Sequence, residues 1–275
     1  MTEDELFDGD LMLARCSRCN GRGVYQEQEL AFDGEDSRMI ERSVPCDCRQ
    51  LPARLLQEAN LPAGRFDGLT LADLEWEYVE PSEAVTAVRN FAVHLEVWLA
   101  EGMGLTLTGS VGTGKTHIAV GLVKLACGLG IESRFLTMAD LLGAIKATYD
   151  RDRMGSPRRR GSETPDEAGL LDELAAVPLL VLDDLGTENP TPWARDRLYT
   201  LVNRRYLSQR PVIVTTNLTL EELARRLGER TVSRLWGASL VINLRGRDYR
   251  ERARRRTLSR IRSRTSELHV LSREA

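Results

Sequence analysis

Residues 109–116 place the strongest constraint on how this chain can fold. They read GSVGTGKT, follow the short apolar run 104–108 and precede a segment with helical character. Between a strand and a helix, such glycines let backbone N–H groups surround phosphate oxygens, while the lysine ammonium reaches the β- and γ-phosphates and the last hydroxyl binds Mg²⁺. The motif therefore predicts a nucleotide-binding P-loop in an α/β domain. The residues expected at the nucleotide are Gly109, Ser110, Val111, Gly112, Thr113, Gly114, Lys115, Thr116 and His117, with Thr116 as a magnesium ligand.

A second apolar run, 178–182, ends in Asp183 and Asp184. A continuous apolar run is typical of a strand buried on both faces of a parallel sheet, and such sheets bind ligands at the carboxyl ends of their strands. After a P-loop this pattern is a Walker B motif: Asp183 holds Mg²⁺, directly or through water, and Asp184 polarises the attacking water. The apolar run 211–214 leads to Asn217, and in P-loop ATPases an amide at this place senses the γ-phosphate.

The remaining patterns complete a central parallel sheet flanked by helices. Further strands are expected at 133–137 and 240–244, and one amphipathic helix at 82–100. Helices are predicted to begin after the cap residues Thr137, Thr191 and Thr219. The first has Asp140 at its third position, the second has proline in its first turn, and the third opens with a capping box.

Four of the five cysteines form two close pairs, Cys16 with Cys19 and Cys46 with Cys48. Four thiolates suit a tetrahedral Zn²⁺ ion, and a closed site of this kind is structural. Cysteines without a metal and an iron–sulfur cluster are the alternatives, because C-x-C is less usual than C-x-x-C. We therefore predict a small N-terminal zinc-binding unit over residues 1–60. The remaining cysteine, Cys127, is expected in the core.

The formal net charge of −3 conceals an uneven distribution. The first ten residues are acidic, whereas arginines crowd the loop 150–164 and the tail 245–264. Such basic runs are either solvated surfaces or contacts to a nucleic-acid backbone. The chain has no long uncharged apolar run, and its N-terminus is acidic where a secretory signal is basic, so a cytoplasmic protein without membrane contact is expected.

Longer phrases point to a particular family. The order of the P-loop, the Asp183-Asp184 pair, Asn217 and the SRL sequence at 233–235 resembles an AAA+ ATPase. The phrases RFLTMADLL (134–142), LVLDDLG (180–186) and GERTVSR (228–234) are similar to the DnaC-type replicative helicase loaders and their IstB-type transposition relatives. The resemblance covers roughly residues 51–252. It implies an AAA+ domain over 61–252, followed by a basic extension over 253–275.

The resemblance also implies roles for single residues. ATP would lie between neighbouring subunits, with Arg234 as the arginine finger and Arg250 as a sensor of the γ-phosphate; for either, a surface salt bridge is the alternative. A guanidinium suits both tasks because its planar donor fork matches phosphoryl oxygens. Single-stranded DNA running through the ring would contact Lys146, Tyr149, Thr191 and Trp193, although the two aromatic rings are also suited to the core.

The function implied is that of an ATP-dependent helicase loader. It would assemble into a ring or spiral on single-stranded DNA, deliver a hexameric replicative helicase contacted by the cysteine-rich unit, and leave after hydrolysis to ADP and phosphate. One alternative is an IstB-type transposition helper on duplex DNA. Another is a DNA-binding module with weak ATPase activity. Asp184 replaces the glutamate of many AAA+ sites and is one methylene shorter, which predicts slow hydrolysis unless Glu188 assists Asp184.

Overall fold

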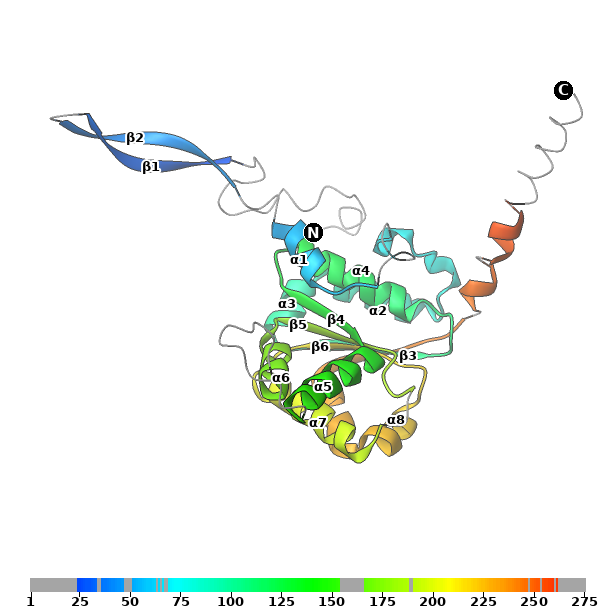
Figure 1. Ribbon diagram of the computed structural model, residues 1–275. Helices are drawn as coiled ribbons and strands as arrows, with labels where there is room; N and C mark the ends of the chain where they lie inside the picture. The colour runs from blue at the N-terminus through cyan, green and yellow to red at the C-terminus, as the bar shows by residue number, and fades with distance from the viewer. Residues whose placement is uncertain are drawn as a thin grey trace, which may run out of the picture.

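The computed structural model describes residues 24–33, 36–46, 51–62, 64, 66, 69–153, 166–187, 190–246, 248–252, 254–259 and 261. Its centre is a parallel five-stranded sheet with the order β4-β5-β6-β3-β7, and helices cover both faces (Figure 1). The predicted α/β fold with a central parallel sheet is confirmed. The strands are β3 (Gly104–Gly109), β4 (Ser133–Thr137), β5 (Leu179–Asp183), β6 (Val212–Thr215) and β7 (Ser239–Leu244).

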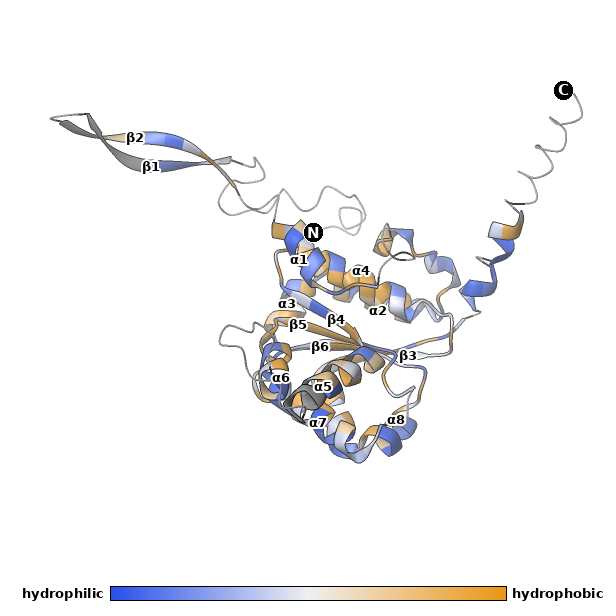
Figure 2. Ribbon diagram, in the orientation of Figure 1, coloured by the Kyte–Doolittle hydropathy of each residue, from blue (hydrophilic) through white to orange (hydrophobic). Residues whose placement is uncertain are grey.

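The two faces of the sheet carry separate hydrophobic clusters. Along β5, Leu179 and Val181 point into one cluster, whereas Leu180 and Leu182 point into the other. This strict alternation makes every residue of β5 buried, which is why its sequence reads as a continuous apolar run. Figure 2 shows the same concentration of apolar residues in the strands and along α4.

Helices from the first half of the chain cover one face of the sheet, and later helices cover the other. One face is covered by α1 (Leu51–Glu58), α2 (Ser82–Val93) and α4 (Lys115–Gly128). The other is covered by α5 (Met138–Arg153), α6 (Glu167–Ala176), α7 (Pro192–Leu207), α8 (Leu220–Leu227) and α9 (Glu229–Gly237). The short helix α3 (Leu95–Ala100) and the 3-10 turns η3 (Leu71–Asp73) and η4 (Trp76–Tyr78) complete the first side. Among these described helices, none has the length and apolarity needed to cross a membrane.

The single helix predicted at 82–100 is wrong in one respect, because it is broken at His94. The backbone of His94 has φ −108° and ψ 26°, which ends α2 and begins α3. Across the break, Phe91 and Trp98 stack with ring centroids 5.6 Å apart. The apolar spacing of the sequence continues through His94, so the pattern alone does not show where α2 ends.

Between the two cysteine pairs lies a hairpin that the sequence analysis did not predict. The strands β1 (Val24–Asp33) and β2 (Asp36–Pro45) pair antiparallel, from Val24 opposite Pro45 to Asp33 opposite Asp36. In Figure 1 this hairpin projects away from the sheet. By contrast, α1 packs on α4, with Leu55 and Ala59 in the cluster that includes α4. The domain divisions at residues 60 and 252 remain predictions.

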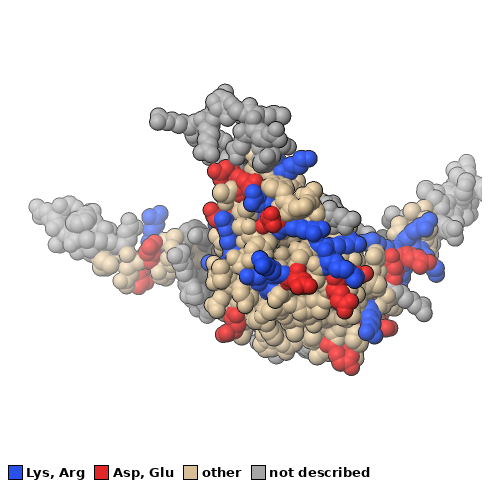
Figure 3. Space-filling model, turned by 90° about the horizontal axis from the view of Figure 1, so that it is seen from below, with Lys and Arg blue, Asp and Glu red and all other residues tan. Residues whose placement is uncertain are grey.

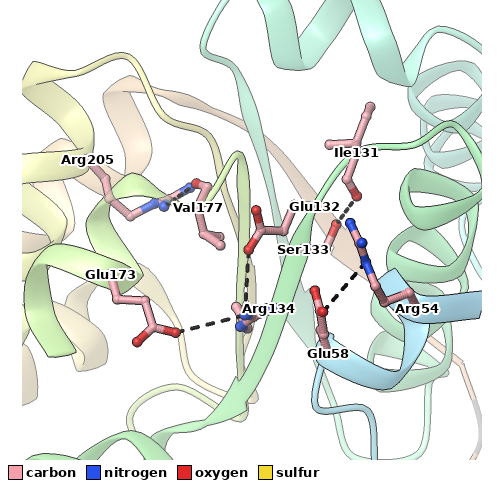
Figure 4. A network of polar contacts seen from close by, with 9 residues as sticks. All are labelled: Arg54, Glu58, Ile131, Glu132, Ser133, Arg134, Glu173, Val177 and Arg205. Atoms are coloured by element: carbon pink, nitrogen blue, oxygen red, sulfur yellow. Dashed lines mark hydrogen bonds and ion pairs between the residues drawn. The ribbon is translucent and has the colours of Figure 1, made fainter. Parts of the chain in front are cut away.

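The amino ends of the strands are held together by arginines (Figure 4). Arg134 of β4 lies between Glu132 and Glu173, at 3.5 and 3.9 Å. Arg205 of α7 is completely buried and donates to backbone carbonyls from two stretches of chain, one at the end of α6 and before β5, the other before β6. Its acceptors are the carbonyl oxygens of Leu174, Ala175, Val177, Pro178 and Pro211. This edge is thereby fixed, and the opposite edge carries the candidate site.

Candidate functional site

The P-loop joins β3 to α4 at the carboxyl edge of the sheet. Gly112 has φ +81°, and a Cβ atom there would lie 2.0 Å from Asp248 Oδ1. Gly109 has φ +135°, and its Cβ would lie 1.8 Å from the Leu244 carbonyl oxygen. Both positions therefore require glycine, because a side chain would meet the backbone of β7 or the segment after it. The turn ends at Lys115, where α4 begins.

Lys115 is held inside this turn. Its Nζ donates to the carbonyl oxygens of Gly109 (2.9 Å) and Ser110 (2.6 Å), and only 7% of the residue is exposed. Burial lowers the pKa of the Lys115 ammonium to about 8, against the opposing effect of Asp184 and Asp183. A buried ammonium beside the first N–H groups of a helix is stabilised by an anionic ligand, so the site favours a phosphate group.

Asp183 ends β5 beside the first turn of α4. Its carboxylate accepts from Thr116 Oγ1 at 3.1 Å and from Thr215 Oγ1 at 2.5 Å. Burial raises the pKa of Asp183, while the hydrogen bonds from Thr215 and Thr116 lower it. A hydroxyl and a carboxylate oxygen in contact are the ligand types that Mg²⁺ takes in nucleotide sites. The structure therefore brings together the two residues predicted to hold the magnesium ion.

Asp184 follows in an unusual backbone conformation. Its φ of +57° lies in the left-handed region, which is uncommon for a residue other than glycine. Its side-chain Oδ1 accepts from Asn217 Nδ2 at 3.0 Å, and its backbone N–H donates to Thr215 Oγ1 at 2.9 Å. The carboxylate and the amide predicted at the γ-phosphate thus lie in contact, although they come from loops after different strands.

The segment after β7 returns to the P-loop. The Tyr249 backbone N–H donates to the Gly112 carbonyl oxygen at 3.1 Å, and its hydroxyl donates to Glu75 Oε1 at 3.1 Å. Arg250 is exposed, and its positive charge makes a small contribution to the lowered pKa of Lys115. Its role as a sensor of the γ-phosphate remains a prediction.

The sequence model of the IstB-like ATP binding protein family matches residues 41–257, most of the chain. This chain belongs to that family.

Curated relatives and a solved structure agree with this assignment. The replicative helicase loader DnaC of Escherichia coli (strain K12) is 33% identical over 146 residues, which is 53% of this chain and 55% of that protein. The chain thus spans about half the length of that relative. DnaC of Buchnera aphidicola subsp. Baizongia pistaciae (strain Bp) is 30% identical over 230 residues, 82% of this chain and 87% of that protein.

The crystal structure of the DnaC helicase loader has 28% sequence identity and a TM-score of 0.54. The alignment covers 66% of this chain and 99% of that chain. Together with the family match, this confirms the predicted DnaC-type and IstB-like AAA+ fold of the ATPase domain.

In this IstB-like domain, Arg234 is held by the neighbouring helix α7. Its Nε donates to Asn203 Oδ1 at 2.7 Å, and its guanidinium carbon lies 5.0 Å from the centre of the Tyr199 ring. A further bond goes to the Arg230 carbonyl oxygen. Among the described residues, none of these contacts is with the P-loop. The structure therefore does not bring Arg234 into the site of its own chain.

The residues predicted to contact DNA are spread over two helices. Lys146 is exposed on α5, and Thr191 is exposed as the N-cap of α7. Trp193 is half-buried against the core, with the Arg197 guanidinium 5.8 Å from its ring centre. Tyr149 lies within α5, but its side chain is outside the described residues.

Other predicted residues lie elsewhere. His117 Nε2 lies 2.8 Å from the Thr70 carbonyl oxygen, so its ring contacts the residue that precedes the 3-10 turn η3. Cys46 is buried, whereas Cys16, Cys19, Cys48 and Glu188 lie outside the described residues. Within the described part of the chain, no three His, Cys, Asp or Glu side chains are grouped as a metal site requires.

Two residues at the site were missed by sequence reasoning. Thr215 contacts both aspartates, and Tyr249 binds the P-loop backbone. A hydroxyl at the carboxyl end of the buried strand before Asn217 was a usable signal for Thr215. Tyr249 carries no comparable local signal, since its contact depends on the return of the chain after β7.

Proposed function

We propose that this chain hydrolyses ATP to ADP and phosphate at the site formed by the P-loop and the carboxyl ends of β5 and β6. The observation that carries the proposal is that the two adjacent aspartates have different partners. Asp183 accepts from the Thr116 hydroxyl, and Asp184 accepts from the Asn217 amide. Thr116 and Asp183 would hold Mg²⁺, which would neutralise charge on the phosphates. Asp184, steadied by the Asn217 amide, would accept the proton of the attacking water. Lys115 and Arg250 would stabilise the γ-phosphate oxygens.

We propose further that the ATPase serves as a replicative helicase loader. The DnaC relatives and the DnaC crystal structure support this role. ATP-bound subunits would assemble into a ring or spiral on single-stranded DNA, with Arg234 reaching the neighbour's γ-phosphate. The N-terminal unit would contact the hexameric helicase, and hydrolysis would release the loader.

The charge on one face supports contact with DNA. Figure 3 views the lower side of Figure 1, where α7 and α8 lie, and Lys and Arg side chains gather there with Asp and Glu side chains between them. The arginines of these two helices include Arg195, Arg197, Arg225 and Arg226. These cationic side chains and Lys146 would bind phosphates with Thr191, while the rings of Tyr149 and Trp193 would stack on bases.

A structural Zn²⁺ ion at the four paired cysteines remains part of the proposal. The hairpin register supports it, because Cys46 directly follows Pro45, and Pro45 pairs with Val24, a short distance after Cys19. The ion would close the base of the hairpin. Metal analysis of the purified protein should find about one zinc per chain, lost in Cys46→Ser and kept in Cys127→Ser. Equal zinc in both variants would contradict the site.

The ATPase proposal is tested with Lys115→Ala and Asp184→Asn. We expect Lys115→Ala to lose binding of a fluorescent ATP analogue. Asp184→Asn should bind normally but release phosphate at least ~10-fold more slowly, because an amide accepts no proton. Asp172→Asn on α6 is the matched control, since its ion pair with Arg204 is exposed and should leave turnover unchanged. Normal turnover in Asp184→Asn would overturn its assigned role.

Assembly is tested by light scattering with no nucleotide, ADP or ATP, each with and without a single-stranded oligonucleotide. Wild type should form a several-subunit assembly with ATP and DNA, and Arg234→Ala should not. Arg54→Ala, which removes an exposed ion pair on α1, serves as the control. A chain that stays monomeric under every condition is not a loader of this kind.

The family match favours one second candidate, an IstB-type transposition helper. Such a protein would assemble on duplex DNA, whereas a loader would prefer single strands. The same light-scattering series with a duplex of equal length separates the two. Strong nucleotide binding without measurable turnover on either DNA would instead indicate a binding module with weak ATPase activity.

A further inference from the structure

Thr215 lies between the two aspartates of the candidate site. Its hydroxyl donates to Asp183 Oδ1 at 2.5 Å and accepts from the Asp184 backbone N–H at 2.9 Å. Thr215 is 1% exposed and Asp183 is 6% exposed, so water does not compete for these bonds. A hydroxyl has one proton to donate, and here it goes to the carboxylate.

The backbone of Thr215 holds the same turn a second time. Its carbonyl oxygen accepts from the Leu185 N–H at 2.8 Å. Two successive N–H groups of the turn after β5 therefore bind one residue of β6, the first through the side chain and the second through the main chain. This double attachment accounts for the left-handed backbone of Asp184, which is unfavourable for a residue other than glycine unless its surroundings hold it.

The two neighbouring carboxylates therefore point in different directions. Asp183 points toward Thr116, and Asp184 points toward Asn217. We infer that Thr215 is a positioning residue whose hydroxyl fixes both orientations, one for holding the metal and the other for the attacking water. This inference rests on the proposed ATPase function and adds a residue that sets its geometry.

Removal of the hydroxyl tests the inference. Thr215→Val keeps the branched shape but cannot donate or accept, and Thr215→Ser keeps the hydroxyl. Loss of a residue that orients a metal ligand typically costs about 10–100-fold in metal affinity or activity. We therefore expect Thr215→Val to need at least ~10-fold more Mg²⁺ for half-maximal binding of a fluorescent ATP analogue and to turn over at least ~10-fold more slowly. Thr215→Ser should stay within about threefold of wild type on both measures.

Thr106→Val is the matched control. Thr106 lies on the adjacent strand β3, opposite Val214, and is also fully buried. Among the described residues its hydroxyl has no hydrogen-bond partner. The same chemical change should therefore leave the Mg²⁺ requirement and the turnover unchanged. Thermal melting checks that each variant is folded, and Thr215→Ala replaces Thr215→Val if the latter does not fold.

The outcomes separate this inference from the proposed function. If a folded variant without the hydroxyl keeps the wild-type Mg²⁺ requirement and turnover, the positioning role is wrong although the ATPase stands. If Thr215→Ser is as impaired as Thr215→Val, packing and not the hydroxyl is responsible, and the inference is also wrong. If wild type binds nucleotide without hydrolysing it, the ATPase proposal fails, and the Mg²⁺ dependence of binding a fluorescent ADP analogue decides the role of Thr215.

Discussion

The buried side chain of Arg205 donates hydrogen bonds to several backbone carbonyl oxygens. The last carbonyl oxygens of α6 have no N–H donor within their own helix. The Arg205 guanidinium donates to two of them and to carbonyl oxygens that precede β5 and β6. Burial lowers the pKa of Arg205, and the positive charge of Arg210 lowers it further. The carbonyl oxygens offset that cost because each is the negative end of a dipole facing the cation.

Substitution of Arg205 should destabilise the fold more than substitution of its neighbour. Arg205→Met leaves buried carbonyl oxygens without donors, and we expect a loss of ~3 kcal/mol in the free energy of unfolding. Arg204→Met removes only the exposed ion pair with Asp172 and should cost at most ~0.5 kcal/mol. Urea denaturation measures both. Equal losses would show that the carbonyl contacts of Arg205 add no stability.

At the scale of elements, helix starts and strand ends carry the site. Thr137 and Asp140 bind each other's backbone at the start of α5, and Thr219 and Glu222 do the same at α8. Thr191 accepts from the Ala194 N–H at 3.2 Å and begins α7. These caps fix where each of the three helices begins beside the carboxyl edge of the sheet, where the candidate site lies.

Thr191 is both a helix cap and a proposed DNA contact, and two substitutions separate these roles. Thr191→Ala removes the cap and should cost ~1 kcal/mol of unfolding free energy. Thr191→Asp keeps a capping oxygen and should retain stability, but its negative charge should weaken binding to single-stranded DNA. Urea denaturation and fluorescence anisotropy with a labelled oligonucleotide provide the two measurements. Unchanged affinity in Thr191→Asp would remove this residue from the DNA surface.

At the scale of the whole molecule, residues from distant parts of the sequence meet beside the P-loop. Glu75 receives Tyr249 and pairs with Arg252 at 3.4 Å and with Arg256, while Tyr249 also binds Gly112. The helical residues that begin at Tyr249 and include Arg252 and Arg256 are thus attached to the P-loop and to Glu75 before α2. Arg234, by contrast, contacts α7 of its own chain, and its role at a neighbouring subunit remains a prediction.

A site shared between subunits makes a prediction for mixtures of inactive variants. Lys115→Ala retains Arg234, and Arg234→Ala retains the P-loop, so a mixed assembly contains complete sites. An equimolar mixture should regain part of the wild-type rate of phosphate release, because an ATP-bound Arg234→Ala subunit and a Lys115→Ala neighbour make a complete site that neither variant can make alone.

The control mixes Lys115→Ala with Asp184→Asn. Both substitutions damage the same side of the site, so no interface is complete and no activity should return. Recovery in the control, or its absence in the test mixture, would contradict a shared site.

Much of the candidate site was predictable because its signals are local. The glycines of the P-loop, the apolar run before Asp183 and the threonine caps each report a backbone requirement within a few residues. The strand and helix after the P-loop follow from the same patterns. Such features can be predicted without knowing the strand order or the packing, because each depends only on residues close together in the sequence.

The sequence alone determined a nucleotide-binding α/β domain and its family. Only the tertiary structure decided which residues meet: Thr215 between the aspartates, Tyr249 on the P-loop, Arg234 on α7, and the break between α2 and α3. Each depends on the order β4-β5-β6-β3-β7 or on packing between elements. Local sequence does not encode such pairings by itself, because they are selected by the burial of both faces of the sheet at once.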